Sequence, residues 1–273
     1  MYAVRNPGSY GRQFLSLAPY GLYASPGWQS QLRQSTLEGI LGRLTGIKTI
    51  SFVWNVRFDH EQLANCLISS GLRFSRVPTR VLGLTPGYER IFAGYNATIR
   101  NHVRKAHRRG VSVRETVSPE SVAEYHRIYT RHAGQRGGYG VIHPVKLLLE
   151  LVEIRNIVRL LVAEHEGRVV GGGLFFRDGN SVRYWHGASD REYSHCYPSC
   201  AVLDEAIRWA CESGAAFFNF GPSVGLSSLD QFKSFWGART ELNWEFAWMN
   251  PLWTRASDLK RRLMGSLQRF SLE

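Results

Sequence analysis

A run of cations between residues 100 and 109 is the part of the sequence whose residue types point most directly to chemistry. On a helix, Arg100, Arg104 and Arg108 recur every four residues and share one face, which Lys105 and Arg109 widen. Like charges at this spacing repel one another, so an anionic ligand would relieve the cost. Because arginine pairs with phosphate through two parallel hydrogen bonds, the pattern predicts a phosphate contact. The alternative interpretation is a solvated basic face.

A second group of candidate residues lies near the end of a predicted strand at 181–189. Strand alternation predicts that Tyr184 and His186 share one face and that Trp185 points to the other. A histidine close to a strand end can act as a general base, and Tyr184 and Asp190 are further candidates. An ordinary hydrogen-bonded histidine is the alternative.

A third group combines a strand that ends in Gly221-Pro222 with a lysine on the short helix that follows. A strand end of this kind opens a backbone niche at the carboxyl edge of a sheet, where ligands commonly bind. Asn219 would line the niche, and Lys233 would place a cation in it. Phe232 and Phe235 flank the lysine, so the alternative is a surface lysine between buried aromatic rings.

Other motifs are weaker or missing. The triplet Gly171–Gly173 indicates either room for a ligand or tight packing of a helix on the sheet. Cys196 and Cys200 lack a second ligand pair at zinc-site spacing, so no metal is expected. A phosphate-binding loop, a dinucleotide fingerprint and a nucleophile elbow do not occur in the sequence.

The overall charge agrees with an anionic partner. The 273 residues contain 34 Lys and Arg against 22 Asp and Glu, a net charge of +12. This excess favours a binding partner such as nucleic acid, an anionic membrane surface or a phosphorylated substrate. The alternative is a basic protein that has no anionic partner. No apolar run reaches the roughly 18 residues that span a bilayer, and residues 1–14 contain no apolar signal core. A cytoplasmic protein without a membrane span is expected.

Hydrophobic periodicity predicts a mixed α/β fold, in which some strands pair as hairpins and others alternate with helices. The dipeptides Glu166-Gly167 and Asp178-Gly179 mark two hairpin turns. Helices are expected at 29–44, 59–70, 88–109, 118–135, 144–155, 199–213 and 228–236, and strands at 14–24, 48–54, 72–84, 111–115, 158–167, 168–179, 181–189, 216–221 and 241–249.

Three segments, in this order, resemble the Fem-type (FemABX-like) aminoacyltransferases of the GNAT superfamily. RNHVRKAHRRG (100–110) resembles the basic helix that joins the two halves of these proteins. LVAEHEGRVVGGGLFF and VRYWHGAS, within 161–189, are similar to their hairpin strands, and AVLDEAIRWACESGAAFFNFGPS with LDQFKSFWGA, within 201–238, is similar to their C-terminal helix, strand and lysine helix.

The resemblance implies a GNAT-like mixed sheet flanked by helices, built as two GNAT-like halves of which the first is incomplete. The expected domains are 1–110, ending in the basic helix 96–109, then 111–250, then a basic C-terminal helix at 251–273. The implied activity moves an amino acid from aminoacyl-tRNA to an acceptor amine and forms an amide without a covalent enzyme intermediate. The acceptor would be a peptide, a peptidoglycan precursor or a small biosynthetic intermediate, and no cofactor is needed.

By similarity, Lys233 matches the family lysine near the acceptor end of tRNA, with Phe232 and Phe235 beside it. Arg104, Lys105 and Arg108 would hold phosphates. The general base stays open among His186, Tyr184 and Asp190, the phosphate of the donor, and water.

The enzymatic alternative is an N-acyltransferase of the same fold that uses a coenzyme A thioester. Residues 191–199 lack the glycine-rich turn that binds the coenzyme A pyrophosphate in ordinary GNAT acetyltransferases, and Pro198 has no N–H to donate. The sequence therefore favours aminoacyl-tRNA. A nucleic-acid-binding protein without catalysis is the third interpretation.

Overall fold

The computed structural model describes residues 39, 41–42, 51–134, 143–223 and 225–252. The chain forms two compact units, one of residues 1–77 and 242–273 and the other of residues 78–241. The predicted segment 14–24, most of 29–44 and nearly all of 251–273 lie outside the described residues. The boundary expected at residue 110 falls inside the second unit.

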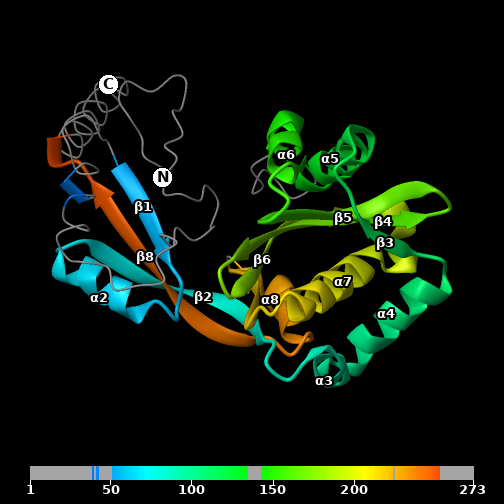
Figure 1. The fold of residues 1–273 in the computed structure, drawn as a ribbon, viewed down its shortest axis with the longest axis horizontal. Helices are drawn as coiled ribbons and strands as arrows, with labels where there is room; N and C mark the ends of the chain where they lie inside the picture. The colour runs from blue at the N-terminus through cyan, green and yellow to red at the C-terminus, as the bar shows by residue number, and fades with distance from the viewer. Residues whose placement is uncertain (1–38, 40, 43–50, 135–142, 224, 253–273) are drawn as a thin grey trace, which may run out of the picture. The chain divides into compact units, whose positions relative to one another are not determined.

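Most predicted elements are present with small changes at their ends (Figure 1). The helices are α2 (Glu61–Ser69), α3 (Tyr88–Gly94), α4 (Ala97–Arg108), α5 (Pro119–Gly134), α6 (Val145–Val152), the 3₁₀ helix η1 (Arg191–Cys196), α7 (Pro198–Glu212) and α8 (Ser227–Ser234). The strands are β1 (Ser51–Val56), β2 (Arg73–Gly83), β3 (Ser112–Glu115), β4 (Val158–His165), β5 (Arg168–Asp178), β6 (Ser181–Ser189), β7 (Phe217–Gly221) and β8 (Arg239–Met249).

The strands are hydrogen-bonded in the order β1-β8-β2-β7-β6-β5-β4-β3, which confirms a mixed α/β fold. The ladders β3–β4, β4–β5 and β5–β6 are antiparallel, whereas β6 and β7 are parallel. Glu166 and Gly167, between β4 and β5, both have positive φ (50° and 73°). Two consecutive positive φ angles are typical of the two-residue hairpin turn that the sequence predicts there.

The helix expected at 88–109 is two helices, α3 and α4, and this is a correction to the sequence prediction. Tyr95 is extended and only 1% exposed, so its ring is buried in the core at the break. Asn96 then begins α4 by accepting a hydrogen bond from the backbone N–H of Thr98 (2.8 Å). Arg100 donates to the carbonyl groups of Ala93 and Tyr95 and so caps the C-terminal end of α3.

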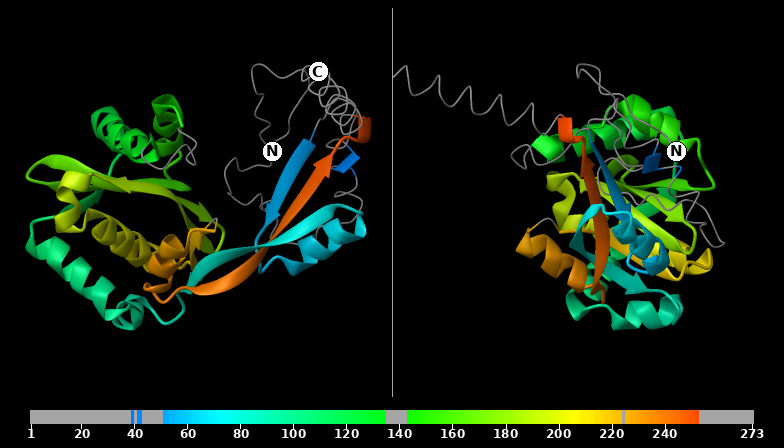
Figure 2. Two further views of the ribbon diagram at one scale, coloured as in Figure 1. Left: turned by 180° about the vertical axis from the view of Figure 1, so that it is seen from behind. Right: turned by 90° about the vertical axis from the view of Figure 1, so that its left-hand side faces the viewer.

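Two adjacent glycines of β5 seat helices on opposite faces of the sheet in the second unit. A Cβ at Gly172 would lie 2.7 Å from the Tyr125 ring of α5, and one at Gly173 would lie 3.3 Å from Val202 of α7. Figures 1 and 2 show α5 with α6 on one face and α7 with α4 on the other. Of the two alternatives for the glycine triplet, the structure therefore supports close helix packing.

Two apolar clusters hold these layers together. The face that carries α4 and α7 includes Ile99, Val103 and Ala106 of α4, all at most 2% exposed. The α5 face includes Tyr125, Leu148 and Leu174. In the first unit, Ala64 and Leu67 of α2 pack with other apolar residues of that unit. Among the described helices, none is long and apolar enough to cross a membrane.

Candidate functional site

The parallel strands β6 and β7 pair over only three residues, Ser181–Arg183 with Phe217–Asn219. Just beyond the pairing, β7 ends at Gly221, which has a φ of 75°. The side-chain oxygen of Asn219 accepts from Thr79 Oγ1 (3.0 Å) and from the N–H of Gly221 (2.7 Å). Asn219 is 1% exposed. It thus shapes the end of β7 from within, and its role in binding substrate stays a prediction.

Lys233 of α8 places its ammonium group at this strand end. Its Nζ donates to the carbonyl oxygens of Gly221 (3.0 Å) and Pro222 (2.8 Å), and the residue is 3% exposed. Burial, together with the nearby charge of Arg183, lowers the pKa of Lys233 to about 8, although Asp230 opposes the shift. An ammonium group has three N–H bonds, and the loop accepts from it through two carbonyl groups. The lysine can therefore fix the loop and still present positive charge.

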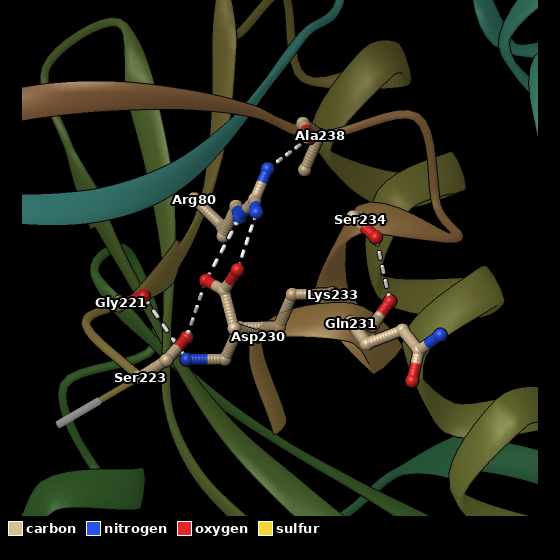
Figure 3. Close-up of polar contacts among 8 residues, drawn as sticks. All are labelled: Arg80, Gly221, Ser223, Asp230, Gln231, Lys233, Ser234 and Ala238. Carbon is tan, nitrogen blue, oxygen red and sulfur yellow. Dashed lines mark hydrogen bonds and ion pairs between the residues drawn. The ribbon is translucent and has the colours of Figure 1, made fainter. Parts of the chain in front are cut away.

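An ion pair between β2 and α8 anchors the helix that carries Lys233 (Figure 3). Arg80 of β2 binds both carboxylate oxygens of Asp230, with Nε 2.9 Å from Oδ1. Ser223 also donates to Asp230 (3.0 Å), so the loop after β7 is tied to α8 at a second point. The hydrogen bond from Arg80 lowers the pKa of Asp230 to about 2. Sequence analysis missed Arg80 and Asp230, although Asp230 stands one helical turn before Lys233 and hints at a shared face.

Tyr184 lies on the α7 face of β6, close to the same strand end. Its ring stacks on Phe175 (centroids 5.4 Å apart), and its hydroxyl group lies against Gly187. A Cβ added to Gly221 would lie 3.9 Å from the Tyr184 carbonyl oxygen and 3.7 Å from the Arg183 guanidinium. Tyr184, Arg183 and Lys233 therefore surround the end of β7.

His186 lies on the opposite face, which contradicts the prediction that it shares a face with Tyr184. Phe175 pairs with Tyr184 and Leu174 pairs with His186, so Trp185 is an extra residue in β6. A bulge of one residue reverses the alternation of the side chains that follow it. The bulge sends His186 to the α5 face, where its ring stacks on Tyr129 with centroids 4.4 Å apart.

The surroundings of His186 do not suit a general base. Its Nδ1 lies 2.8 Å from the Tyr125 hydroxyl group, and its Nε2 is buried without a hydrogen-bond partner among the residues that the structure describes. Burial lowers the pKa of His186 to about 3, with smaller contributions from His143 and His126. An imidazole of that pKa is neutral at pH 7 and accepts protons poorly.

Asp190 follows β6 and is engaged on both oxygens. Arg131 of α5 donates to Oδ2 (3.1 Å), and the N–H of Glu192 donates to Oδ1 (3.2 Å). Its side chain is 17% exposed. The structure therefore separates the predicted catalytic residues, because Tyr184 and Lys233 lie at one strand end, His186 on the other face, and Asp190 beside Arg131.

The predicted phosphate contacts on α4 fall into two groups. Arg104, Arg108 and Arg109 are exposed, and Lys105 is half-buried. Arg100 is committed in part to the carbonyl groups that end α3. Arg109 donates to the carbonyl oxygen of His195 in η1, and its guanidinium carbon lies 5.7 Å from the centre of the Tyr197 ring.

Phe232 and Phe235 are half-buried and pack against the apolar cluster on the α7 face. Phe232 meets Trp236 edge to face, with centroids 6.1 Å apart. The carbonyl oxygen of Phe235 accepts from the N–H of Asn96 (2.7 Å), which joins the lysine helix to the start of the basic helix. Core packing, one of the two sequence interpretations, therefore accounts for their position, and stacking on a base stays a prediction.

The segment 191–199 forms η1 and the first turn of α7 instead of an open glycine turn. Tyr197 adopts a left-handed conformation (φ 57°), and its ring stacks on His102 with centroids 4.0 Å apart. Pro198 occupies the first turn of α7 and has no N–H. Cys196 and Cys200 are buried free thiols, and the described residues contain no group of three His, Cys, Asp or Glu side chains placed to bind a metal.

Known proteins support this description. The chain is 24% identical over 130 residues to the UDP-N-acetylmuramoylpentapeptide-lysine N(6)-alanyltransferase of Weissella viridescens. The alignment covers 46% of this chain and only 38% of that relative. This relative agrees with the resemblance to Fem-type proteins that the three sequence segments indicate.

Solved structures share the fold. The crystal structure of FemX superposes with a TM-score of 0.67 at 14% identity, covering 92% of this chain and 84% of FemX. L-PGS from Bacillus licheniformis superposes with a TM-score of 0.55 at 16% identity, covering 85% and 77% of the two chains. At these identities the likeness shows the fold alone.

The sequence also matches the family described as "Acetyltransferase (GNAT) domain" over residues 93–234. The matched stretch runs from α3 to α8 and contains the basic helix, the bulged strand β6 and Lys233. Because it covers just over half of the chain, the protein belongs to the family described as "Acetyltransferase (GNAT) domain".

Proposed function

We propose that the protein moves an amino acid from aminoacyl-tRNA to an acceptor amine and forms an amide bond. The observation that carries the proposal is the Lys233 ammonium group, buried and fixed at the end of β7. The exposed arginines of α4 support it, because the backbone bond between Asn96 and Phe235 links that helix to the lysine helix. The alanyltransferase named above also supports the proposal, because its name states the transfer of an amino acid to an amine.

In the proposed reaction, the amine nitrogen attacks the ester carbonyl carbon of the donor. A C–N bond forms, the carbonyl oxygen becomes an oxyanion, and the C–O bond to the ribose then breaks. Lys233 would stabilise either this oxyanion or the terminal phosphate of the donor by its fixed charge. The amine proton would pass to the departing ribose oxygen, directly or through water, since His186 is neutral and Asp190 is paired with Arg131.

The acceptor in this proposal is an amine on a peptide, a peptidoglycan precursor or a small biosynthetic intermediate. The relative from Weissella viridescens is named for the N6 amine of a lysine in a muramoylpentapeptide, which is a peptide amine. We infer a cytoplasmic setting, because charged tRNA is the donor, and no bound cofactor is required.

The competing function is N-acyl transfer from a coenzyme A thioester, which the description of the matched family favours. The geometry of residues 191–198 opposes it, because Pro198 removes one of the N–H groups available at the start of α7.

The two functions are distinguished by incubating the protein with a pool of radiolabelled aminoacyl-tRNAs and, separately, with labelled acyl-CoAs. We expect selective protection or turnover of one charged tRNA. Turnover of an acyl-CoA together with indifference to tRNA charging would overturn the proposal.

A further inference from the structure

A small hollow lies at the end of β6, on the α5 side, away from the end of β7. It is lined by Ile128, Arg131, His132, Ser189, Asp190 and Arg191. Arg131 comes from α5 and Arg191 from the start of η1, and both side chains are exposed. Two guanidinium groups from separate elements around one hollow form a typical arrangement for binding an oxyanion.

The one acidic residue that lines the hollow, Asp190, cancels only part of this charge. Asp190 already accepts from Arg131 and from a backbone N–H, so its charge is partly compensated within the protein. Glu192 is exposed and is the other acid in this part of η1. Arg191 and the outer N–H groups of Arg131 then face solvent beside the apolar side chain of Ile128, which is 7% exposed.

The hollow is joined to the basic face of α4 through η1. Arg191 begins η1, and His195, near its other end, accepts the hydrogen bond from Arg109 of α4. At a rise of about 2 Å per residue, η1 spans roughly 8 Å between these points. Exposed cations therefore follow one another from Arg108 and Arg109, across η1, to Arg191 and Arg131.

We propose that this hollow binds a backbone phosphate in the single-stranded acceptor end of tRNA, with Arg131 and Arg191 as its ligands. The inference rests on the proposed function and adds a binding site to it. RNA is favoured over coenzyme A because the cations continue onto α4, as a long phosphodiester backbone requires. The first turn of α7, with Pro198, offers no complete backbone cradle for a pyrophosphate.

The test compares the double variant Arg131→Gln/Arg191→Gln with Arg127→Gln. Arg127 is a matched control, because it lies one turn earlier on α5, is 72% exposed and pairs only weakly with Glu124 (3.9 Å). The probes are total tRNA and the same tRNA without its 3′-terminal CCA. Affinity is measured by filter binding between about 50 and 200 mM salt, and circular dichroism checks that each variant is folded.

We expect the double variant to bind intact tRNA about tenfold more weakly than the wild type, with a salt slope smaller by roughly 0.7, the value for one single-strand phosphate. Removal of CCA should weaken the wild type by a similar factor and leave the double variant unchanged. Equal affinities and slopes for the double variant and Arg127→Gln would overturn the inference and leave the proposed function standing. If the wild type bound coenzyme A through these arginines and ignored tRNA, both the RNA assignment and the proposed function would fail.

Discussion

The hydroxyl group of Tyr125 lies 2.8 Å from Nδ1 of His186, and their rings are nearly parallel, at 4°. This contact crosses from α5 to β6 and depends on a third residue, because the Tyr125 ring occupies the space where a Cβ at Gly172 would stand. The absence of a side chain at one position of β5 thus sets how α5 rests on the sheet and how the His186 ring is held.

We expect Gly172→Ala to lower the free energy of unfolding by about 2 kcal/mol, as overpacking in a core typically does. The new methyl group would meet the Tyr125 ring at 2.7 Å and the Leu161 carbonyl oxygen at 2.8 Å, and the backbone oxygen cannot rotate away. Gly83→Ala is the control, because a Cβ there would have no atom of the described residues within 4 Å. Urea unfolding measures both variants, and an equal loss in the two would contradict the close-packing argument.

His186 should make the protein acid-sensitive without acting as a base. Its pKa is lowered to about 3 in the folded state and is about 6.5 in the unfolded state, so the unfolded chain binds more protons between these values. Stability from this group is therefore present above pH 6.5 and is lost as the pH falls toward 3, by about 2 kcal/mol between pH 7 and pH 5.

His186→Gln should remove this part of the pH dependence, so the difference in unfolding free energy between the wild type and the variant should be smaller at pH 5 than at pH 7. If His186 is not a general base, the pH profiles of activity of the wild type and of His186→Gln should have the same inflections. A difference that stayed constant with pH, or a loss of such an inflection, would show that His186 ionises near neutrality.

Lys233→Met should reduce transfer activity at least about 100-fold, the usual effect of removing one group that stabilises an oxyanion.

Lys233 should also make the free energy of unfolding rise with pH in the alkaline range. Because the pKa of Lys233 is lowered from 10.5 to about 8, the unfolded chain binds more protons between pH 8 and 10.5, and stability rises with pH in that window. The wild type should therefore gain about 2 kcal/mol relative to Lys233→Met between pH 7 and pH 9.5. Parallel stability curves would mean that Lys233 is not buried as a cation.

Arg104→Ala/Arg108→Ala should weaken tRNA binding strongly at low salt, because both side chains are exposed on α4. Each lost phosphate contact reduces the salt slope by about 0.7 to 0.9. Lys146→Ala serves as the control, since Lys146 is 83% exposed but stands on α6, on the other face of the sheet. If the two variants showed the same affinity and slope, the basic face of α4 would not be a tRNA contact.

Local patterns were sufficient for most of the fold. The hairpin turn at Glu166-Gly167 has a short-range signal, and α5, α7 and the hairpin strands follow from periodicity. The bulge at Trp185 has no such signal, because alternation on either side of it looks regular in the sequence. The break at Tyr95 was missed for a similar reason, since burial of that ring, and not helix propensity, ends α3.

The site was harder to derive than the fold because its partners are distant in the chain. Arg80 and Asp230 are 150 residues apart, and Tyr125 and His186 are 61 apart, so no spacing rule connects them. Lys233 was identified by resemblance and by residue type, but its two carbonyl partners depend on how β7 ends. The cations can be recognised by residue type, whereas tertiary contacts decide which of them, such as Arg109, are already engaged within the protein.

Asp190→Asn separates two roles for that carboxylate. If Asp190 is a general base, as the sequence allows, the variant should lose activity about 100-fold or more. The structure favours the other outcome, because Asp190 is paired with Arg131 and caps η1 through the N–H of Glu192. Asparagine can keep the cap and removes a negative charge from the hollow, so Arg131 becomes more available to phosphate. We therefore expect tRNA binding to tighten about two- to fivefold, by roughly 0.4 to 1 kcal/mol, with activity retained.

Initial rates and filter binding, measured on the same preparation of Asp190→Asn, distinguish the two roles. A loss of activity with unchanged affinity for tRNA would show that Asp190 is the general base.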